Sequence, residues 1–149
     1  MHRQGEPQTM QQAPHYDQPI EDAVGEFLLQ RIAACEGAGL GRERLVLDPG
    51  FGFGKTAEHN LRLLNRLQAL GELDLPLLAG MSRKSMIGKV TGRPVEERLA
   101  GGVALSALAV ERGAKILRVH DVAETVDAVN MAWAVLNEGC CPATTEGVR

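Results

Sequence analysis

The sequence predicts an α/β fold in which parallel β-strands alternate with α-helices. Three short apolar segments are candidate strands, and they begin roughly 30 to 40 positions apart, at 45–48, 77–80 and 116–120. Each is followed by a loop and then by apolar residues at helical spacing, a pattern typical of a parallel sheet with helices outside. None shows an alternating polar face, as expected for strands covered on both sides. This order fits either a small open sheet or part of an eight-stranded barrel, which typically needs about 250 residues.

The composition is that of an average globular protein. Of the 149 residues, 44% are hydrophobic and 23% are charged, and the net charge is -3. This charge excludes the strongly basic surface that binds nucleic acid or anionic membranes. No apolar run is long enough to span a membrane, and the polar residues 1–12 lack a signal-peptide core. Three cysteines without zinc-ligand spacing predict a reducing, cytoplasmic setting.

The first half is predicted to contain a loop, a helix, a strand and a second helix. Residues 1–19 hold three prolines and no apolar period, so we expect a loop. Residues 20–39 have apolar side chains at helical spacing and end in two glycines. After the strand at 45–48, we expect a helix from about residue 56 to residue 70, with three leucines on one face.

The second half repeats the alternation and ends in a helix. In order, we expect a strand at 77–80, a long loop at 81–93, a helix at 94–112, a strand at 116–120 and a helix at 122–136. Gly101 and Gly102 cost helix stability, so they indicate close packing against a neighbouring element. Asp121 and Glu124 have the spacing of a capping box for the last helix.

A glycine-rich segment, Asp-Pro-Gly-Phe-Gly-Phe-Gly-Lys-Thr at 48–56, follows the first predicted strand. It is not a phosphate-binding P-loop, because Pro49 stands where that motif needs its first glycine. The glycine spacing also differs from the dinucleotide-binding fingerprint. Three glycines let the backbone approach a ligand closely, with Asp48 at the strand end. The alternative is a tight strand-to-helix turn in which Asp48 is a turn or capping residue, and the spacing leaves both open.

Two further polar clusters follow the second and third predicted strands. Residues 82–85, Ser-Arg-Lys-Ser, suit an anionic ligand or form a solvated basic loop. Arg118 and His120 are two positions apart and share a strand face, where arginine binds phosphate oxygens with two N–H groups. An isolated strand-end histidine is more often structural. Because parallel strands place active sites at their carboxyl ends, we expect this pair to share one pocket with Asp48 and Lys84.

The remaining notable residues receive no functional role from their pattern. Three residues at core spacing are assigned to packing: Cys35, Met131 and Trp133. No partner spacing gives a role to the other histidines, His2, His15 and His59. The tail at 138–149, with adjacent Cys140 and Cys141, is expected to be flexible.

These motifs resemble the dihydropteroate synthase family in order and spacing. The matching segments are 48–55, 80–85 with Ile87 and Gly88, and 118–121, and residues 1–10 resemble the segment that leaves that family's fifth barrel strand. The resemblance covers residues 1–137. It implies the C-terminal part of a pterin-binding (β/α)8 TIM barrel, about strands six to eight with four helices, which is an incomplete barrel.

The resemblance implies a transferase of folate biosynthesis. It would condense p-aminobenzoate with 6-hydroxymethyl-7,8-dihydropterin diphosphate to give 7,8-dihydropteroate and diphosphate. Arg118 and His120 would stabilise the negative charge that builds on the leaving diphosphate, and Lys84 would contact the pterin ring and help to shape the p-aminobenzoate site. The arylamine is the nucleophile, so no Ser or Cys of the enzyme needs to attack.

The same resemblance assigns residues to substrate binding. Asp48 would accept hydrogen bonds from the pterin amino and ring N–H groups. Ser85 would hold the p-aminobenzoate carboxylate near a helix start, and Phe53, beside Gly52, would lie against its ring.

The family's first half is absent from this sequence, together with the Asn that binds Mg2+ with the diphosphate. No metal ligand is therefore expected in this chain, although the family uses Mg2+, forms homodimers and is a sulfonamide target. Met1 falls where relatives have an internal Met, as a misplaced start codon or a gene fragment would produce. The alternative function is a non-catalytic half-barrel that self-associates through its open edge or complements the missing half.

Overall fold

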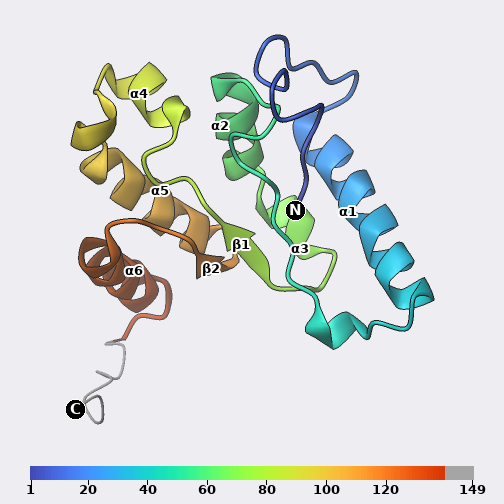
Figure 1. Ribbon diagram of the computed structural model, residues 1–149. Coiled ribbons are helices and arrows are strands. Elements are labelled where there is room, and N and C mark those ends of the chain that lie inside the picture. The colour runs from blue at the N-terminus through green and yellow to red at the C-terminus, as the bar shows by residue number, and fades with distance from the viewer. Residues whose placement is uncertain (140–149) are drawn as a thin grey trace.

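Helices surround a short parallel sheet in the computed structural model, which describes residues 1–139 (Figure 1). The helices are α1 (Ile20–Gly37), α2 (Ala57–Asn65), α3 (Gln68–Gly71), α4 (Ser85–Thr91), α5 (Leu99–Glu111) and α6 (Val122–Leu136). The strands are β1 (Leu77–Ala79) and β2 (Ala114–Leu117), and two 3₁₀ turns are η1 (Arg42–Arg44) and η2 (Val95–Glu97). The predicted α/β class is confirmed. From residue 140 on, the expected flexible tail lies outside the described residues, as do Cys140 and Cys141.

The sheet consists of two parallel strands and one bridging residue beside them. β1 pairs with β2, and Leu47 forms a parallel bridge with Leu77 on the other edge of β1. The strand predicted at 45–48 is therefore wrong in extent, because it pairs at a single residue before Pro49, which has no N–H to donate. The strand predicted at 116–120 lies earlier, at Ala114–Leu117. One further bond, from Arg118 N to Ala79 O (3.0 Å), extends the ladder past its end.

Two helix predictions are wrong in their limits. The single helix expected at 56–70 is divided into α2 and α3, and the helix expected at 94–112 begins as η2 before α5. The loop expected at 81–93 contains α4, a seven-residue helix that ends at Gly92 in the left-handed region (φ +71°). Such a helix is too short to show a periodic apolar pattern in the sequence. The helices predicted at 20–39 and 122–136 are confirmed as α1 and α6.

Close packing at the glycine pair of α5 is confirmed. A Cβ added to Gly101 would lie 2.5 Å from Cγ2 of Ile87, so the side chain of this α4 residue occupies the space that a larger residue would need. Ile87 is itself buried, as is Gly102. The approach of α5 to α4 therefore explains the glycine at position 101, at a cost in helix propensity, whereas a Cβ at Gly102 would make ordinary contact at 3.8 Å.

The hydrophobic core lies between α1, α2, α3 and the inner edge of the sheet. Its largest fully buried apolar side chains are Phe51, Ile20, Leu28, Leu63, Leu67, Leu70, Leu77 and Val24. By contrast, α6 packs against α5 at the outer side and contributes Thr125 as its buried residue. The assignment of Met131 and Trp133 to core packing is therefore wrong, because they are 65% and 38% exposed. Cys35 is half-buried.

The capping box expected at Asp121 and Glu124 is also wrong, since Asp121 makes no side-chain cap bond to α6. A capping box forms instead at the start of α2, where Thr56 Oγ1 accepts from His59 N (3.1 Å) and His59 Nδ1 accepts from Thr56 N (3.3 Å). His59 thus has a structural role that its position in the sequence did not show. Within residues 1–139, the helices are too short or too polar to cross a membrane.

Candidate functional site

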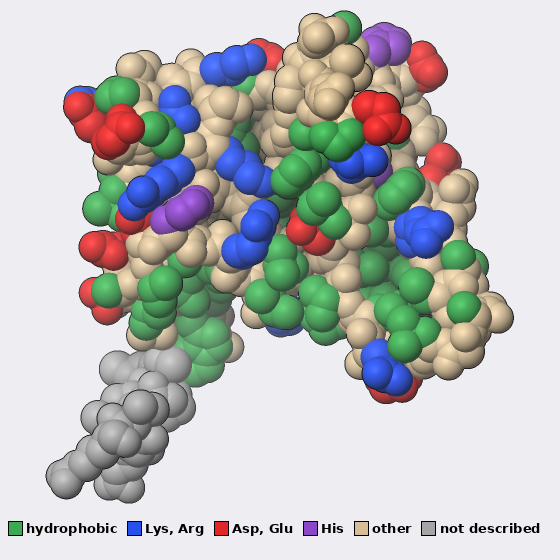
Figure 2. All heavy atoms as spheres, in the orientation of Figure 1, with side chains coloured by type: hydrophobic (Ala, Val, Ile, Leu, Met, Phe, Trp, Pro, Cys, Tyr) green, Lys and Arg blue, Asp and Glu red, His purple; other side chains and the backbone are tan. Residues whose placement is uncertain are grey.

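The three polar clusters follow neighbouring parallel segments of the sheet. Asp48 comes directly after Leu47, Gly80 directly after β1, and Arg118 directly after β2. Because these segments run in parallel, their carboxyl ends lie at the same edge. Figure 2 shows Lys, Arg and His side chains gathered on the face between α4 and α6. The expected placement of the clusters at one edge is confirmed.

The glycine-rich segment forms a tight turn. Asp48 Oδ1 accepts a hydrogen bond from Gly50 N (2.7 Å), and Phe53 N donates to Gly50 O (3.1 Å). Gly50, Gly52 and Gly54 all have left-handed φ angles, of +71°, +79° and +67°, which glycine adopts at little cost. The interpretation of Asp48 as a turn residue is thus confirmed for one of its two carboxylate oxygens. The other, Asp48 Oδ2, makes no hydrogen bond to the described residues, so it is available to a ligand.

The loop at residues 1–19 covers this turn. His2 N donates to Asp48 O (2.9 Å), and a Cβ added to Gly50 would lie 1.8 Å from His2 O. Farther along, Tyr16 Oη donates to Gly54 O (2.8 Å). The first residues of the chain and the glycine-rich turn therefore form one unit, and its close approach requires glycine at position 50.

Lys84 extends from the loop after β1 across the glycine-rich turn. Its ammonium donates to the carbonyl oxygen of Phe51 and lies 4.7 Å from the centroid of the Phe53 ring, as in a cation–π contact. A Cβ added to Gly52 would lie 3.1 Å from Lys84 Cδ, so glycine makes room for the lysine stem. The predicted residues Gly52, Phe53 and Lys84 are thus brought together.

The charges of the site act on one another. Burial and, to a smaller extent, the nearby Arg118 charge lower the pKa of Lys84 to about 8, although the Asp48 carboxylate opposes this change. The charges of Asp48 and Arg118 therefore both act on Lys84. With two cations beside one carboxylate, this edge of the sheet favours an anionic ligand.

A cavity of about 530 Å³ lies beside these charges, and residues of the second and third polar clusters line it. Its polar lining includes Ser82, Arg83, Lys84, Arg118 and His120. His120 Nδ1 lies 3.0 Å from Ser82 Oγ, which joins the loops after β1 and β2. Ser85 is exposed as the first residue of α4 and does not line this cavity. The shared pocket expected for Asp48, Lys84 and the Arg118–His120 pair is therefore confirmed except for Asp48, which does not line it.

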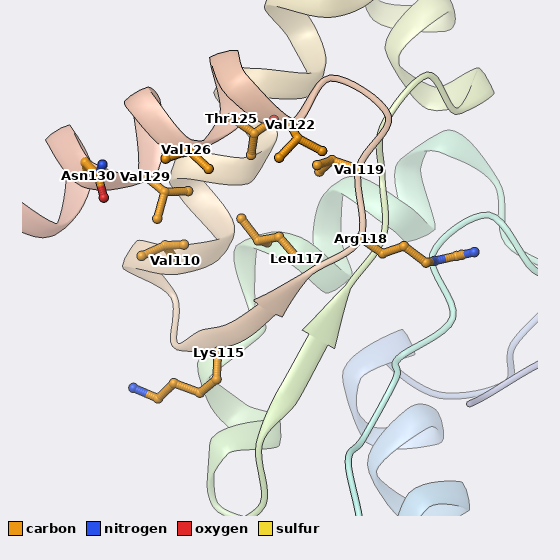
Figure 3. Close-up of a pocket in the computed structure, with 10 residues that line it drawn as sticks. All are labelled: Val110, Lys115, Leu117, Arg118, Val119, Val122, Thr125, Val126, Val129 and Asn130. Carbon is orange, nitrogen blue, oxygen red and sulfur yellow. The ribbon is translucent and has the colours of Figure 1, made fainter. Parts of the chain in front are cut away.

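Arg118 borders both this cavity and the apolar space beneath α6. That space has a volume of about 460 Å³ and is lined largely by valines of α5 and α6 with Leu117. Figure 3 shows the Arg118 side chain pointing away from those valines. The predicted alternation is confirmed in part. Arg118 and His120 line the polar cavity and Leu117 lines the apolar space, but Arg118 and Val119 border both.

An ion pair that the sequence analysis did not predict connects the two loops at the cavity. Arg83 Nη2 and Nε donate to the Asp121 carboxylate at 2.6 and 3.3 Å. This hydrogen bonding lowers the pKa of Asp121 and raises that of Arg83. Arg98 also donates to Arg83 O (3.0 Å). Arg83 is therefore turned toward Asp121, which leaves Lys84 as the cation of its cluster nearest the glycine-rich turn.

Sequence reasoning also missed three buried polar residues beneath the glycine-rich turn: His2, Lys55 and Asn60. Asn60 Oδ1 accepts from Gly52 N (2.7 Å), and its Nδ2 donates to Thr56 O (2.6 Å). A polar residue on the same helical face as Leu63 and Leu64 was the available signal. By contrast, His15 is exposed and lies 3.2 Å from Asp17.

Burial lowers the pKa of Lys55 and of Lys84, so the free energy of unfolding is expected to depend on pH. Burial lowers the pKa of Lys55 to about 7, whereas in the unfolded chain it is near 10.5. Between these values the unfolded chain binds more protons, so the free energy of unfolding should increase as the pH rises from 7 toward 10. Urea unfolding across this range measures the increase.

Lys55→Met should make this increase smaller, because it removes one of the two buried lysines, and Lys89→Met, at an exposed position, should retain it. An unfolding free energy in the unsubstituted chain that stays constant or falls between pH 7 and 10 would contradict the burial of these charges.

Known proteins match this chain over most of its length. The model of the family described as "Pterin binding enzyme" matches residues 1–120. The dihydropteroate synthase of Escherichia coli (strain K12) is 50% identical over 137 residues, which cover 92% of this chain and 48% of that protein. The enzyme of Haemophilus influenzae is 47% identical, with 92% and 50% covered. The chain thus spans about half the length of the curated relatives it matches.

Solved structures give the same result. The dihydropteroate synthase of Yersinia pestis, solved with a sulfonamide drug complex, superimposes with a TM-score of 0.89 at 44% identity, covering 92% of this chain and 50% of that one. The enzyme of Xanthomonas albilineans in complex with 7,8-dihydropteroate has a TM-score of 0.80 at 53% identity, with 83% and 47% covered. With the family match over residues 1–120, these similarities show that the chain belongs to the family of pterin binding enzymes.

Proposed function

We propose that this chain carries the pterin-binding and diphosphate-binding part of a dihydropteroate synthase. The reaction would join p-aminobenzoate to 6-hydroxymethyl-7,8-dihydropterin diphosphate, giving 7,8-dihydropteroate and diphosphate. The observation that carries the proposal is that Asp48, Lys84 and Arg118 follow three parallel segments at one edge of the sheet. The high identity to dihydropteroate synthases over nearly the whole chain supports this choice of reaction.

The cavity chemistry suits the leaving group of this reaction. The amine nitrogen of p-aminobenzoate would attack the pterin methylene carbon, and the C–O bond would break with its electron pair moving to the diphosphate. The amine nitrogen then loses a proton. Arg118 and His120, which line the cavity, would stabilise the charge on the departing oxygens. An arginine is suited to this role because it holds phosphate oxygens with paired N–H groups.

The glycine-rich turn supplies groups that suit the two ring systems. Asp48 Oδ2 would accept from the pterin amino and ring N–H groups, since Oδ1 is held by Gly50 N. Lys84 would contact the pterin ring, and Phe53, beside Gly52, would lie against the p-aminobenzoate ring. Ser85, at the start of α4, would bind the p-aminobenzoate carboxylate.

The resemblance to the family implies that Mg2+ takes part. The protein ligand of this ion would lie in the half of the family that this chain does not contain. When bound, the ion would neutralise diphosphate charge. The cavity is lined by Arg83, Lys84 and Arg118, whose positive charges suit an anion. This chain would therefore contribute Arg118 and His120, which would contact the negative charge of the diphosphate.

We propose that the Leu47 segment, β1 and β2 are strands six to eight of a (β/α)8 barrel, within a partial domain at residues 1–137. Their order in the chain and their parallel pairing support this assignment. The homodimer and the cytoplasmic setting that the resemblance and the cysteines imply stay predictions.

A chimeric enzyme tests the proposed function. This chain would replace the corresponding segment of the Escherichia coli relative, and diphosphate release would be followed with both substrates present. We expect release that matches dihydropteroate formation. A folded chimera that binds neither substrate and releases no diphosphate would overturn the proposal.

Asp48→Asn should weaken binding of the pterin substrate by the chimera about 10- to 100-fold, because a hydrogen bond to a charged group contributes about 1.5 to 3 kcal/mol. Asp127→Asn is the matched control, since Asp127 is an exposed residue of α6. Isothermal titration with the pterin diphosphate measures both. Equal affinities in the two variants would remove Asp48 from the pterin site.

A second candidate function is the non-catalytic half-barrel, and one observation favours it. An apolar groove of about 490 Å³ between α5 and α6 is lined by Leu108, Met131, Val135 and Leu136, among others. Sedimentation of this chain over a range of concentrations tests it. Concentration-dependent association, together with no diphosphate release by either the chain or the chimera, would favour this candidate over the synthase.

A further inference from the structure

We propose that Lys55 is a positioning residue, whose buried ammonium holds the glycine-rich turn in the conformation that places Asp48 and Lys84 at the site. The consequence for substrate binding rests on the proposed function. The positioning itself is a property of the folded chain and can be measured without substrate.

The contacts of Lys55 fix both ends of the turn. Its Nζ donates to Gly50 O (2.8 Å) and to Phe53 O (3.3 Å), and it lies 2.8 Å from His2 Nδ1. An ammonium has three N–H donors, and these three acceptors use all of them. The bond to His2 also attaches the first residues of the chain, which lie 53 positions away in the sequence. A single side chain thus joins the turn to the segment that covers it.

The histidine is in the right protonation state to accept this bond. Burial and the neighbouring Lys55 charge lower the pKa of His2 to about 4, so its ring is neutral near pH 7. A neutral imidazole has one nitrogen that accepts and one that donates, and Nδ1 must be the acceptor beside an ammonium. His2 also packs edge-on against Phe27, with the ring centroids 4.9 Å apart, which holds the imidazole in place.

Lys55 acts on the site through other residues and does not reach a ligand itself. It is 3% exposed, and its donors are all directed at protein acceptors. Lys84, in contrast, donates to Phe51 O and lies over the Phe53 ring. Lys84 is therefore held by residues 51 and 53. Residue 51 lies between Gly50 and Phe53, whose carbonyl groups accept from Lys55, and residue 53 is one of these two.

The same turn positions Asp48. Gly50 N donates to Asp48 Oδ1, while Gly50 O accepts from Lys55, so the peptide groups on both sides of Gly50 connect the lysine to the carboxylate. The Asp48 charge opposes the effect of burial on Lys55, whereas the Lys84 charge adds to it. Loss of the ammonium would leave the Phe53 carbonyl and the buried His2 imidazole without this donor, and Gly50 O would keep only the bond from Phe53 N, which destabilises this arrangement.

The test uses the complete 149-residue chain and two substitutions with different demands on folding. Lys55→Met keeps the length of the side chain and removes all three bonds. His2→Phe keeps the ring that packs on Phe27 and removes one acceptor, so it reports on the same contact if the methionine variant does not fold. Lys89→Met is the control, because Lys89 is exposed on α4.

The first readout is the titration of the Lys84 side chain by NMR. Its pKa, about 8 in the folded chain because of burial, should move up toward 10.5 in Lys55→Met and by a smaller amount in His2→Phe. Amide exchange at residues 50–54 should accelerate in the same variants and stay unchanged in Lys89→Met. His2→Phe keeps the Lys55 charge, so a shift of the Lys84 pKa in this variant does not come from removal of a neighbouring charge. An unchanged Lys84 titration in His2→Phe, together with unchanged amide exchange at residues 50–54 in Lys55→Met, would overturn the proposal.

The second readout is the affinity for 6-hydroxymethyl-7,8-dihydropterin diphosphate. We expect at least a tenfold loss in Lys55→Met and less than a twofold change in Lys89→Met. If the unsubstituted chain binds the pterin and the methionine variant binds it equally well, the positioning role is wrong while the proposed function stands. If the unsubstituted chain does not bind the pterin, the Lys84 titration in His2→Phe and the amide exchange at residues 50–54 decide whether Lys55 positions the turn.

Discussion

Replacing Arg118 with alanine should lower the turnover of the chimeric synthase by about 100- to 1000-fold, the usual loss when one donor to a developing negative charge is removed. Arg118 lines the polar cavity and points away from the apolar side of the sheet (Figure 3). The charge on the departing diphosphate exists fully only as the C–O bond breaks. The rate constant should therefore fall more than the affinity for the pterin substrate.

The Arg118 prediction has two matched controls. Arg118→Lys keeps a positive charge but loses the paired N–H groups, so it should recover part of the lost turnover. Arg44→Ala removes an exposed arginine in η1, and its turnover should equal that of the parent. Because Arg118 is exposed, the thermal unfolding temperature should change little in either Arg118 variant. Unchanged turnover in Arg118→Ala would exclude this residue from stabilising the leaving group.

Gly50→Ala should destabilise the chain by about 2 to 5 kcal/mol, the largest stability loss that we expect from a single methyl group. Two costs add at this position. The backbone has a φ of +71°, which is unfavourable for alanine, and the new Cβ would lie 1.8 Å from the carbonyl oxygen of His2. The segment at residues 1–4 would have to move off the turn.

Gly92→Ala separates these two costs. Gly92 also has a φ of +71°, but a Cβ there would meet nothing within 4 Å. Its substitution should cost about 1 to 2 kcal/mol, the strain of the left-handed backbone alone. Urea unfolding of both variants measures the difference. Equal losses in the two variants would show that residues 1–4 do not pack on the turn as described.

Local patterns in the sequence predicted the features that depend on local chemistry. Apolar spacing predicted α1 and α6, and the positions of Asp48, Lys84 and Arg118 after successive strands predicted their common edge. The same reasoning failed where an element is short. Within the segment expected to be a loop, α4 has too few residues for a periodic pattern, and the Leu47 segment pairs at one residue.

Contacts between distant segments were beyond such reasoning. No spacing rule connects His2 to Lys55, or Arg83 to Asp121, because each contact depends on how two loops fold over the sheet edge. The exposure of Met131 and Trp133 has a similar origin. Their spacing is that of a core-facing helix side, but α6 lies at the outer side of the described sheet, where these positions have no covering element in the structure.

The most direct test of the shared site is NMR mapping of pterin diphosphate binding to this chain. If Asp48, Lys84 and the Arg118–His120 pair form one binding edge, backbone amide shifts should change together at 48–55, 80–85 and 118–121. The valines of α6 that line the apolar space should change little (Figure 3). Saturable shifts confined to that apolar space, with none at the three polar segments, would contradict this binding site.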